Sequence, residues 1–117
     1  MENSTVQAIA KYIPISAQKV RRVTRVVSGM TVLEALAYLE FMPQRAAKPV
    51  RKVIASAAAN AEENLDIPRD DLFVAMIAAD AGPTRKWRRF GARGRFKPIK
   101  RRSSHIRVVL KEIESAT

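Results

Sequence analysis

The sequence has no cysteine among its 117 residues, a single histidine, and no apolar run longer than about eight residues. The lack of cysteine excludes disulfides, thiolate catalysis and cysteine-based zinc sites, and it suits a reducing compartment. The apolar runs are too short to span a bilayer, which takes about 20 residues. The N-terminus has no basic segment followed by an apolar core, so we expect no secretion signal and a protein that stays inside the cell.

Groups that could catalyse a reaction are scarce as well. His105 has no cysteine, second histidine or obvious carboxylate near it in the sequence with which to form a relay. The glycines of residues 91–94 lack both the spacing and the strand-to-helix context of a phosphate-binding loop. We therefore predict that the protein is not an enzyme and needs no cofactor, and that His105 bonds to backbone or to RNA.

Positive charge is abundant and concentrated in one place. Lys and Arg number 22 against 11 Asp and Glu, which gives a net charge of +11, and ten of the 22 lie between Arg85 and Arg102 without one acid. A field of this kind points first to nucleic acid and second to an anionic membrane surface. Hydrophobic residues make up 47% of the chain, which is ordinary for a single globular domain of this length.

Two apolar, strand-like runs flank this basic segment: Leu72 to Ala79 before it and Ile106 to Leu110 after it. Such a pair suggests an antiparallel hairpin. The connection is about twenty residues long, whereas hairpin loops usually have ~2–5, and long loops are either functional or disordered. Arms of about ten residues at ~3.3 Å each reach ~30 Å, well beyond a compact body with a radius of gyration of ~13 Å.

The basic segment, residues 83–102, has nothing that would hold it folded alone. Its only large apolar side chains are Trp87, Phe90, Phe96 and Ile99. A polyanion would neutralise the cations with its phosphates and offer bases on which the aromatic rings stack. Gly91 and Gly94 allow a tight turn near the tip. We expect the segment to be mobile until it binds nucleic acid; a solvated basic loop without function is the alternative, which attachment at both ends disfavours.

The N-terminal part predicts one strand and a first helix. Val6 to Ile13 is rich in β-branched residues and ends at Pro14, as expected of a strand. Ser16 is predicted to cap a helix that runs to about Ser28, with Gly29 as its stop. The apolar face of this helix comprises Val20, Val23 and Val27. Its other face is basic and free to bind phosphate, with Lys19, Arg21, Arg22 and Arg25.

Two more helices are predicted before the Leu72 strand. Thr31 to Glu34 forms a capping-box pattern that begins the second, and Met42-Pro43 closes it. We predict that its apolar face consists of Leu33, Leu36 and Ala37. The third has the cleanest helical spacing, with Pro49 in its first turn and with an apolar face of Val50, Val53, Ile54, Ala57, Ala58 and Ala61. A second basic patch near its start comprises Lys48, Arg51 and Lys52.

The element order predicts an α+β fold in a single domain, with three helices packed on a small three-stranded antiparallel sheet and a long basic β-hairpin extension. We predict a globular body of residues 1–82 and 103–117 and a hairpin loop of residues 83–102.

An acidic cluster follows the third helix and comprises Glu62, Glu63, Asp66, Asp70 and Asp71. A metal site is conceivable there, but the spacing matches no calcium-binding EF-hand loop. We favour a solvated surface turned away from the nucleic acid, and we predict no metal.

Four segments of the chain resemble one known family. They read SAQKVR at residues 16–21, AAANAEEN at 57–64, DAGP at 80–83 and ARGRFKPIKRRSSHI at 92–106. In this order and spacing the chain is similar to the large-subunit ribosomal proteins of the universal L-twenty-two (uL-twenty-two) family, bacterial type. It differs from that family at the hairpin tip, where Phe90 and Gly91 replace Pro then Arg, and Phe96 replaces a small residue.

The resemblance implies a cytoplasmic protein of the large ribosomal subunit, with the ribosome of an organelle as the open alternative. It also implies a body on the outer surface of that subunit and a hairpin that runs inward along rRNA to the wall of the peptide exit tunnel. The implied role is structural and includes subunit assembly, and the implied partners are 23S-type rRNA, neighbouring large-subunit proteins and the nascent peptide. We expect neither a membrane partner nor a homo-oligomer. Charge and resemblance together predict rRNA contacts at Lys19, Arg21, Arg22, Arg25, Lys48, Arg51, Lys52, Arg85, Lys86, Trp87, Arg88, Arg89, Phe90, Arg93, Arg95, Phe96, Lys97, Lys100, Arg101, Arg102, Ser104 and His105.

Two other classes of function fit the composition less well. A free-standing nucleic-acid-binding protein or RNA chaperone would insert the basic loop into a groove and would act away from ribosomes. A protein that binds membrane surfaces would need an amphipathic helix, which Gly91, Gly94 and Pro98 disfavour in the basic segment.

Overall fold

The structure is a computed structural model that describes residues 5–83, 85–90 and 96–113. In chain order its elements are β1 (Thr5–Ile13), α1 (Ala17–Val27), α2 (Val32–Glu40), α3 (Ala47–Leu65), a short 3₁₀ helix η1 (Arg69–Asp71), β2 (Leu72–Ala81), β3 (Arg85–Phe90), β4 (Phe96–Arg101) and β5 (Ser104–Glu112). This order confirms the predicted α+β class. Among the described residues, no helix combines the length and hydropathy that a membrane crossing requires.

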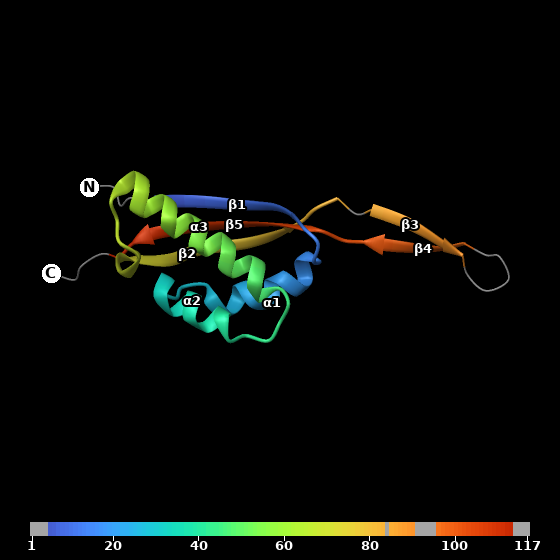
Figure 1. Cartoon of the computed structure of the whole chain (residues 1–117), viewed down its shortest axis with the longest axis horizontal. Helices are drawn as coiled ribbons and strands as arrows, with labels where there is room; N and C mark the ends of the chain where they lie inside the picture. Colours follow the sequence, from blue (N-terminus) through green and yellow to red (C-terminus); the bar gives the residue numbers. More distant parts are fainter. Residues whose placement is uncertain (1–4, 84, 91–95, 114–117) are drawn as a thin grey trace.

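The main sheet has three antiparallel strands in the order β1-β5-β2, as Figure 1 shows. β5 lies in the middle, and its first residue, Ser104, is paired with Ile13 of β1 on one side and with Ala81 of β2 on the other. Burial alternates along β5: Ile106 and Val108 are fully buried whereas Arg107 is exposed. The sheet therefore has one face in the core and one toward solvent.

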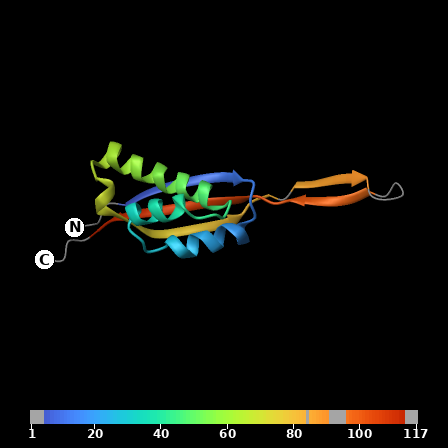
Figure 2. The same ribbon diagram turned by 60° about the horizontal axis from the view of Figure 1, so that its bottom comes forward.

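The three helices cover the core face of this sheet (Figures 1 and 2). α1 packs on β2, α3 packs on β1 and β5, and α2 packs on α3. The predicted buried faces of α1 and α3 are confirmed, since every residue named for them is buried. Ala57 and Ala58 of α3 are fully buried, and their small side chains let this helix approach the sheet closely.

The predicted buried face of α2 is wrong. Leu33 and Ala37 are exposed, and the helix instead packs through Val32, Ala35 and Leu39, with only Leu36 of the predicted set against the core. The error arose because the apolar residues of this short helix surround most of its circumference, so periodicity alone could not orient it.

The predictions for the ends of α1 and α2 are partly confirmed. The Thr31 hydroxyl accepts a hydrogen bond from the Glu34 N–H at 3.3 Å, which confirms the predicted cap of α2. Ser16 occupies the N-cap of α1 but its side chain makes no capping bond, so that prediction is wrong about the hydroxyl. Gly29 follows α1 with a φ of +87° and donates to the Val74 carbonyl at 2.9 Å, so it both ends the helix and anchors it to β2.

The hairpin extension is confirmed. Beyond the main sheet the chain forms a separate antiparallel pair, β3 with β4, whose register runs from Arg85↔Arg101 to Phe90↔Phe96. This ribbon projects from one end of the body (Figures 1 and 2). The molecule measures 71 × 25 × 19 Å with a radius of gyration of 17.6 Å, against about 13 Å for a compact chain of this length. The predicted tip glycines, Gly91 and Gly94, lie outside the described residues.

Candidate nucleic-acid interface

The register of the β3–β4 ribbon opposes like charges. Three of its six pairs join two cations: Arg85↔Arg101, Lys86↔Lys100 and Arg89↔Lys97. Like charges directly opposite each other destabilise a strand pair. A polyanion along the ribbon would convert this repulsion into attraction. Of the contacts predicted for the hairpin, Arg93 and Arg95 lie outside the described residues.

The base of the hairpin is held by a compact set of contacts that we call the neck, consisting of Tyr12, Gly82, Pro83, Ser103 and His105. The Gly82 N–H donates to the Ser103 carbonyl at 2.9 Å. The Ser103 hydroxyl in turn donates to the Pro83 carbonyl at 2.9 Å. These bonds join the two arms where they leave the main sheet, so the neck sets the direction in which the hairpin projects.

His105 joins Tyr12 of β1 to the rest of the neck. Its Nδ1 accepts a hydrogen bond from the Tyr12 backbone N–H at 3.0 Å, and the two rings are perpendicular with centroids 5.0 Å apart. Tyr12 has a φ of 58° where the β1–β5 register shifts, and a non-glycine residue in this conformation costs about 1–3 kcal/mol. The contacts with His105 help to hold that strained bulge.

A methyl group at Gly82 should weaken the neck. A Cβ built there lies 2.5 Å from Ser103 Oγ and 3.3 Å from His105 Cε1, so the hydroxyl must leave Pro83. We expect Gly82→Ala to lower the free energy of unfolding by about 1 kcal/mol, measured by urea denaturation. In a Ser103→Ala background the clash with Oγ is absent and only the contact with the His105 ring remains, so the same change should cost clearly less or be neutral. Equal effects in both backgrounds would contradict this account of the neck.

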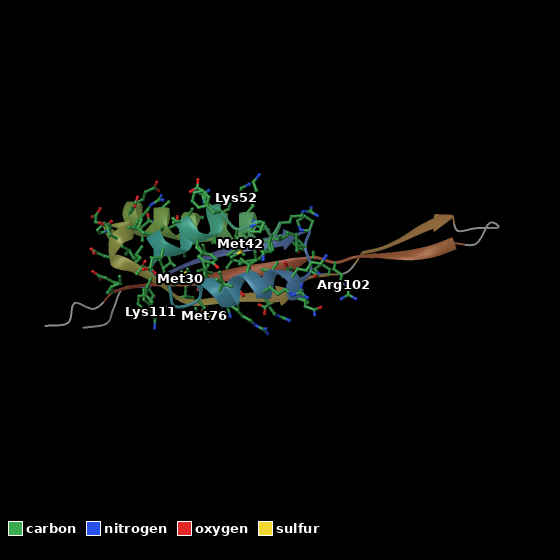
Figure 3. The ribbon with its side chains drawn as sticks, turned by 90° about the horizontal axis from the view of Figure 1, so that it is seen from below. Met30, Met42, Lys52, Met76, Arg102 and Lys111 are labelled. Carbon is green, nitrogen blue, oxygen red and sulfur yellow. The ribbon has the colours of Figure 1, made fainter. Side chains whose placement is uncertain are left out.

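Two adjacent grooves lie on the body next to the neck. The first, of about 600 Å³, is bounded by α1, the loop before α3 and the hairpin base. Its lining residues are Pro14, Ile15, Ser16, Gln18, Lys19, Arg22, Gln44, Arg45, Ala46 and Arg102. Figure 3 shows Arg102 where the hairpin leaves the body, near one end of α1. Four cations from three separate parts of the chain thus border one concave surface.

The second groove, of about 450 Å³, lies between β1 and the start of α3. Its floor is apolar, with Ile9, Ile13 and Val53, and its cations are Arg45, Lys48 and Lys52. Both grooves include Pro14, Ile15 and Arg45, so they form one continuous surface. We call the six cations that border it, Lys19, Arg22, Arg45, Lys48, Lys52 and Arg102, the cationic groove.

The structure therefore unites three patches that the sequence presented separately: α1, the start of α3 and the hairpin base. It does not unite all of their members, because Arg25 and Arg51 are exposed but line neither groove. Arg21 is also exposed, yet its Nε donates to the Ala79 carbonyl at 3.0 Å. β2 is an edge strand, so Arg21 satisfies a carbonyl there and ties α1 to the sheet.

The structure places Ser104 and His105 in the body, next to the base of the hairpin. The Ser104 side chain is 0% exposed, so its hydroxyl lies inside the body where RNA has no access. His105 is half-buried and bonds to Tyr12, which matches the backbone alternative considered for it.

Two residues of the candidate interface, Arg45 and Tyr12, were not predicted from the sequence. Arg45 lies in a loop, and Tyr12 is 65% exposed at the neck, where its ring could stack on a base. No periodicity in the sequence marks either of them.

The acidic cluster lies at the end of the body away from the hairpin, on the C-terminal part of α3 and on η1 (Figure 1). Within it, the Arg69 guanidinium bonds to Glu62 at 2.8 Å on the surface. Over residues 5–83 and the other described segments, no group of three or more His, Cys, Asp or Glu side chains is placed to hold a metal ion. The acidic cluster therefore lies at the opposite end of the body from the hairpin.

Comparison with known proteins gives a consistent answer. Residues 8–111 match the family described as Ribosomal protein L22p/L17e. A protein of Synechococcus sp. (strain JA-3-3Ab) is 47% identical over 109 residues, which cover 93% of this chain and 89% of the relative. A protein of Desulfitobacterium hafniense is 48% identical over 91% of this chain and 93% of its own length, and one of Pediococcus pentosaceus is 44% identical over 93% and 92%. Each of these relatives is named Large ribosomal subunit protein uL22.

Proposed function

This chain belongs to the ribosomal protein L22p/L17e family, and we propose that it binds large-subunit rRNA through the cationic groove and the basic hairpin together. It is a structural, non-enzymatic protein of the large subunit of the bacterial cytoplasmic ribosome, like the relatives with which it shares most of its length. Membership of the family confirms the two predictions that the chain is a ribosomal protein of this family and that it is not an enzyme.

The observation that carries this proposal is the continuity of the cationic groove with the base of the hairpin. Arg102 lines the first groove and directly follows β4, whose last residue is Arg101. A phosphate backbone lying in the groove would therefore continue along the ribbon without crossing an acidic surface. The apolar floor between β1 and α3 adds a place for a base or a ribose beside the phosphates.

We further propose that the far end of the hairpin lines the peptide exit tunnel and contacts the nascent chain. The molecule is 71 Å long although its other dimensions are 25 and 19 Å, so the ribbon carries charge far from the body. A surface-bound body with such an extension reaches into the interior of a large RNA particle. There the protein bridges RNA segments that are distant from one another, which is how it assists subunit assembly.

Deleting Arg88 to Arg93 tests the role of the hairpin end. The core and the cationic groove lie elsewhere, so we expect the fold and incorporation into large subunits to be preserved. The response to macrolides and the pausing of particular nascent chains should change, because the tunnel wall is altered. The variant is expressed as the only copy, and its occupancy in purified subunits is compared with drug sensitivity. Unchanged drug response and pausing at full occupancy would remove the tunnel role and leave rRNA binding intact.

The alternative function, that of a free-standing RNA-binding protein, would place most of the protein away from ribosomes in the cell. We expect the chain to co-sediment with the large subunit after a high-salt wash, since its contacts are many and buried in the particle. Release of most of the protein into the free fraction under that wash would favour the alternative function.

A further inference from the structure

The second helix carries an apolar surface that the fold does not use. Leu33 and Tyr38 are each 51% exposed, and Phe41 is 84% exposed. Together with Ala37, which is also exposed, they form what we call the α2 surface. Helix α2 already packs through Val32, Ala35 and Leu39, so these exposed side chains contribute little to the core.

The same part of the chain lacks positive charge. Between Arg25 and Arg45 there is no Lys or Arg, although the chain has 22 of them. Glu34 and Glu40 are both exposed on α2, so they border the α2 surface with negative charge. Of the nine large hydrophobic side chains exposed in the described residues, four belong to this stretch: Val26, Leu33, Tyr38 and Phe41.

The exposed apolar side chains, the two flanking glutamates and the lack of nearby cations exclude RNA as the partner of the α2 surface. A phosphate backbone needs cations to neutralise it, and here it would meet Glu34 and Glu40 instead. A second copy of this chain is also disfavoured, because two molecules of net charge +11 repel each other. Large apolar side chains gathered on an otherwise polar surface are the mark of a protein interface, and Tyr and Phe are enriched at such interfaces.

We propose that the α2 surface docks a basic, amphipathic segment of another protein of the large subunit. Leu33 and Ala37 are spaced at i and i+4 on one side of α2, and the exposed Phe41 caps the C-terminal end of the same helix. Together they offer apolar side chains that an apolar partner face can cover. Glu34 and Glu40 flank these side chains and pair with Lys or Arg of the partner, which orients it. Such partners are expected to be basic because they too contact rRNA. The surface is distinct from the cationic groove and adds a protein contact to the proposed RNA contacts.

The test is a photo-crosslinker placed in the assembled particle. Benzoylphenylalanine replaces Phe41 in the only copy of the protein, large subunits are purified and irradiated, and the crosslinked peptide is identified by mass spectrometry. We expect one protein partner, joined through a segment of net positive charge that contains apolar residues. A crosslink to rRNA, to a second copy of this chain, or to nothing would overturn the proposal.

The same probe at Lys52 keeps this test separate from the proposed function. Lys52 lines the second groove, and there we expect a crosslink to rRNA. Failure at Phe41 with success at Lys52 would remove the docking surface alone, whereas the reverse result would remove the RNA groove alone.

Charge reversal checks the electrostatic half of the proposal. Glu34→Lys with Glu40→Lys should lower the yield of the Phe41 crosslink by about tenfold, since like charges then face the partner. The matched control, Glu63→Lys with Asp80→Lys, makes the same change in net charge at two exposed acids outside α2 and should leave the yield unchanged. Circular dichroism verifies the fold of both variants. Equal yields in the two variants would show that the partner is not recognised by its positive charge.

Discussion

Raising the salt concentration from about 50 to about 200 mM should weaken the binding of this protein to large-subunit rRNA by roughly 10³–10⁵-fold, if six to ten phosphates are contacted. The cationic groove alone supplies Lys19, Arg22, Arg45, Lys48, Lys52 and Arg102, and the hairpin adds further cations. Each one that contacts a phosphate releases a condensed counterion, and the entropy of that release falls as the bulk salt rises. The measurement is a filter-binding or fluorescence titration at several salt concentrations, which gives the slope of log affinity against log salt.

Replacing single groove cations refines this result. Arg22→Ala should lower the slope by about one unit, because one phosphate contact is lost. Arg25→Ala should change it less, since Arg25 lies on the same helix but lines neither groove. A slope near zero for the unchanged protein would mean that base stacking rather than charge dominates the affinity.

Reversing two charges of the cationic groove should have the second large effect. Arg22 on α1 and Lys52 on α3 line the first and second groove respectively, and both are exposed. Hydrogen bonds to charged groups contribute about 1.5–3 kcal/mol each, so Arg22→Glu with Lys52→Glu should weaken rRNA binding by roughly 10²–10⁴-fold. Occupancy in purified large subunits should fall with it.

The chain offers a close control for this variant. Arg25→Glu with Arg51→Glu makes the same change in net charge on the same two helices, at exposed positions outside both grooves. Neither position lines a groove, so the control removes no predicted phosphate contact, and it should lose clearly less affinity than the groove variant. Equal losses in the two variants would show that net charge rather than the groove controls binding. Arg21 is unsuitable for such a test, because its bond to Ala79 ties α1 to β2.

Most of the fold was predictable because short patterns of apolar and polar residues specify each helix and strand. The spacing of Val50, Ile54 and Ala57 oriented α3 correctly, and the apolar runs on either side of the basic segment became the adjacent strands β2 and β5. The orientation of α2 was not predictable, since Leu33 and Leu39 are equally apolar and only packing against α3 decides which is buried. Its misassigned residues, Leu33 and Ala37, turned out to belong to the α2 surface.

The cationic residues of the candidate interface could be named from the sequence, but their arrangement in space could not. Runs of Lys and Arg identified the patches, and the resemblance to a ribosomal family supplied their purpose. That Lys19, Arg45 and Arg102 border one groove depends on the tertiary fold, because they are far apart in the sequence. The buried position of Ser104 and the bond from Tyr12 to His105 depend on the register of β5 with its neighbours, which the pattern of residue types does not specify.

The most direct measurement of the division between RNA-binding and protein-binding surfaces is a map of UV-induced nucleotide adducts on this protein in purified large subunits, read by mass spectrometry of its peptides. The account predicts adducts on peptides from the cationic groove and from residues 85–102. It predicts none on the segment from Val26 to Gln44, which contains the α2 surface and has no Lys or Arg. Adducts concentrated on that segment, with the groove peptides unmodified, would contradict it.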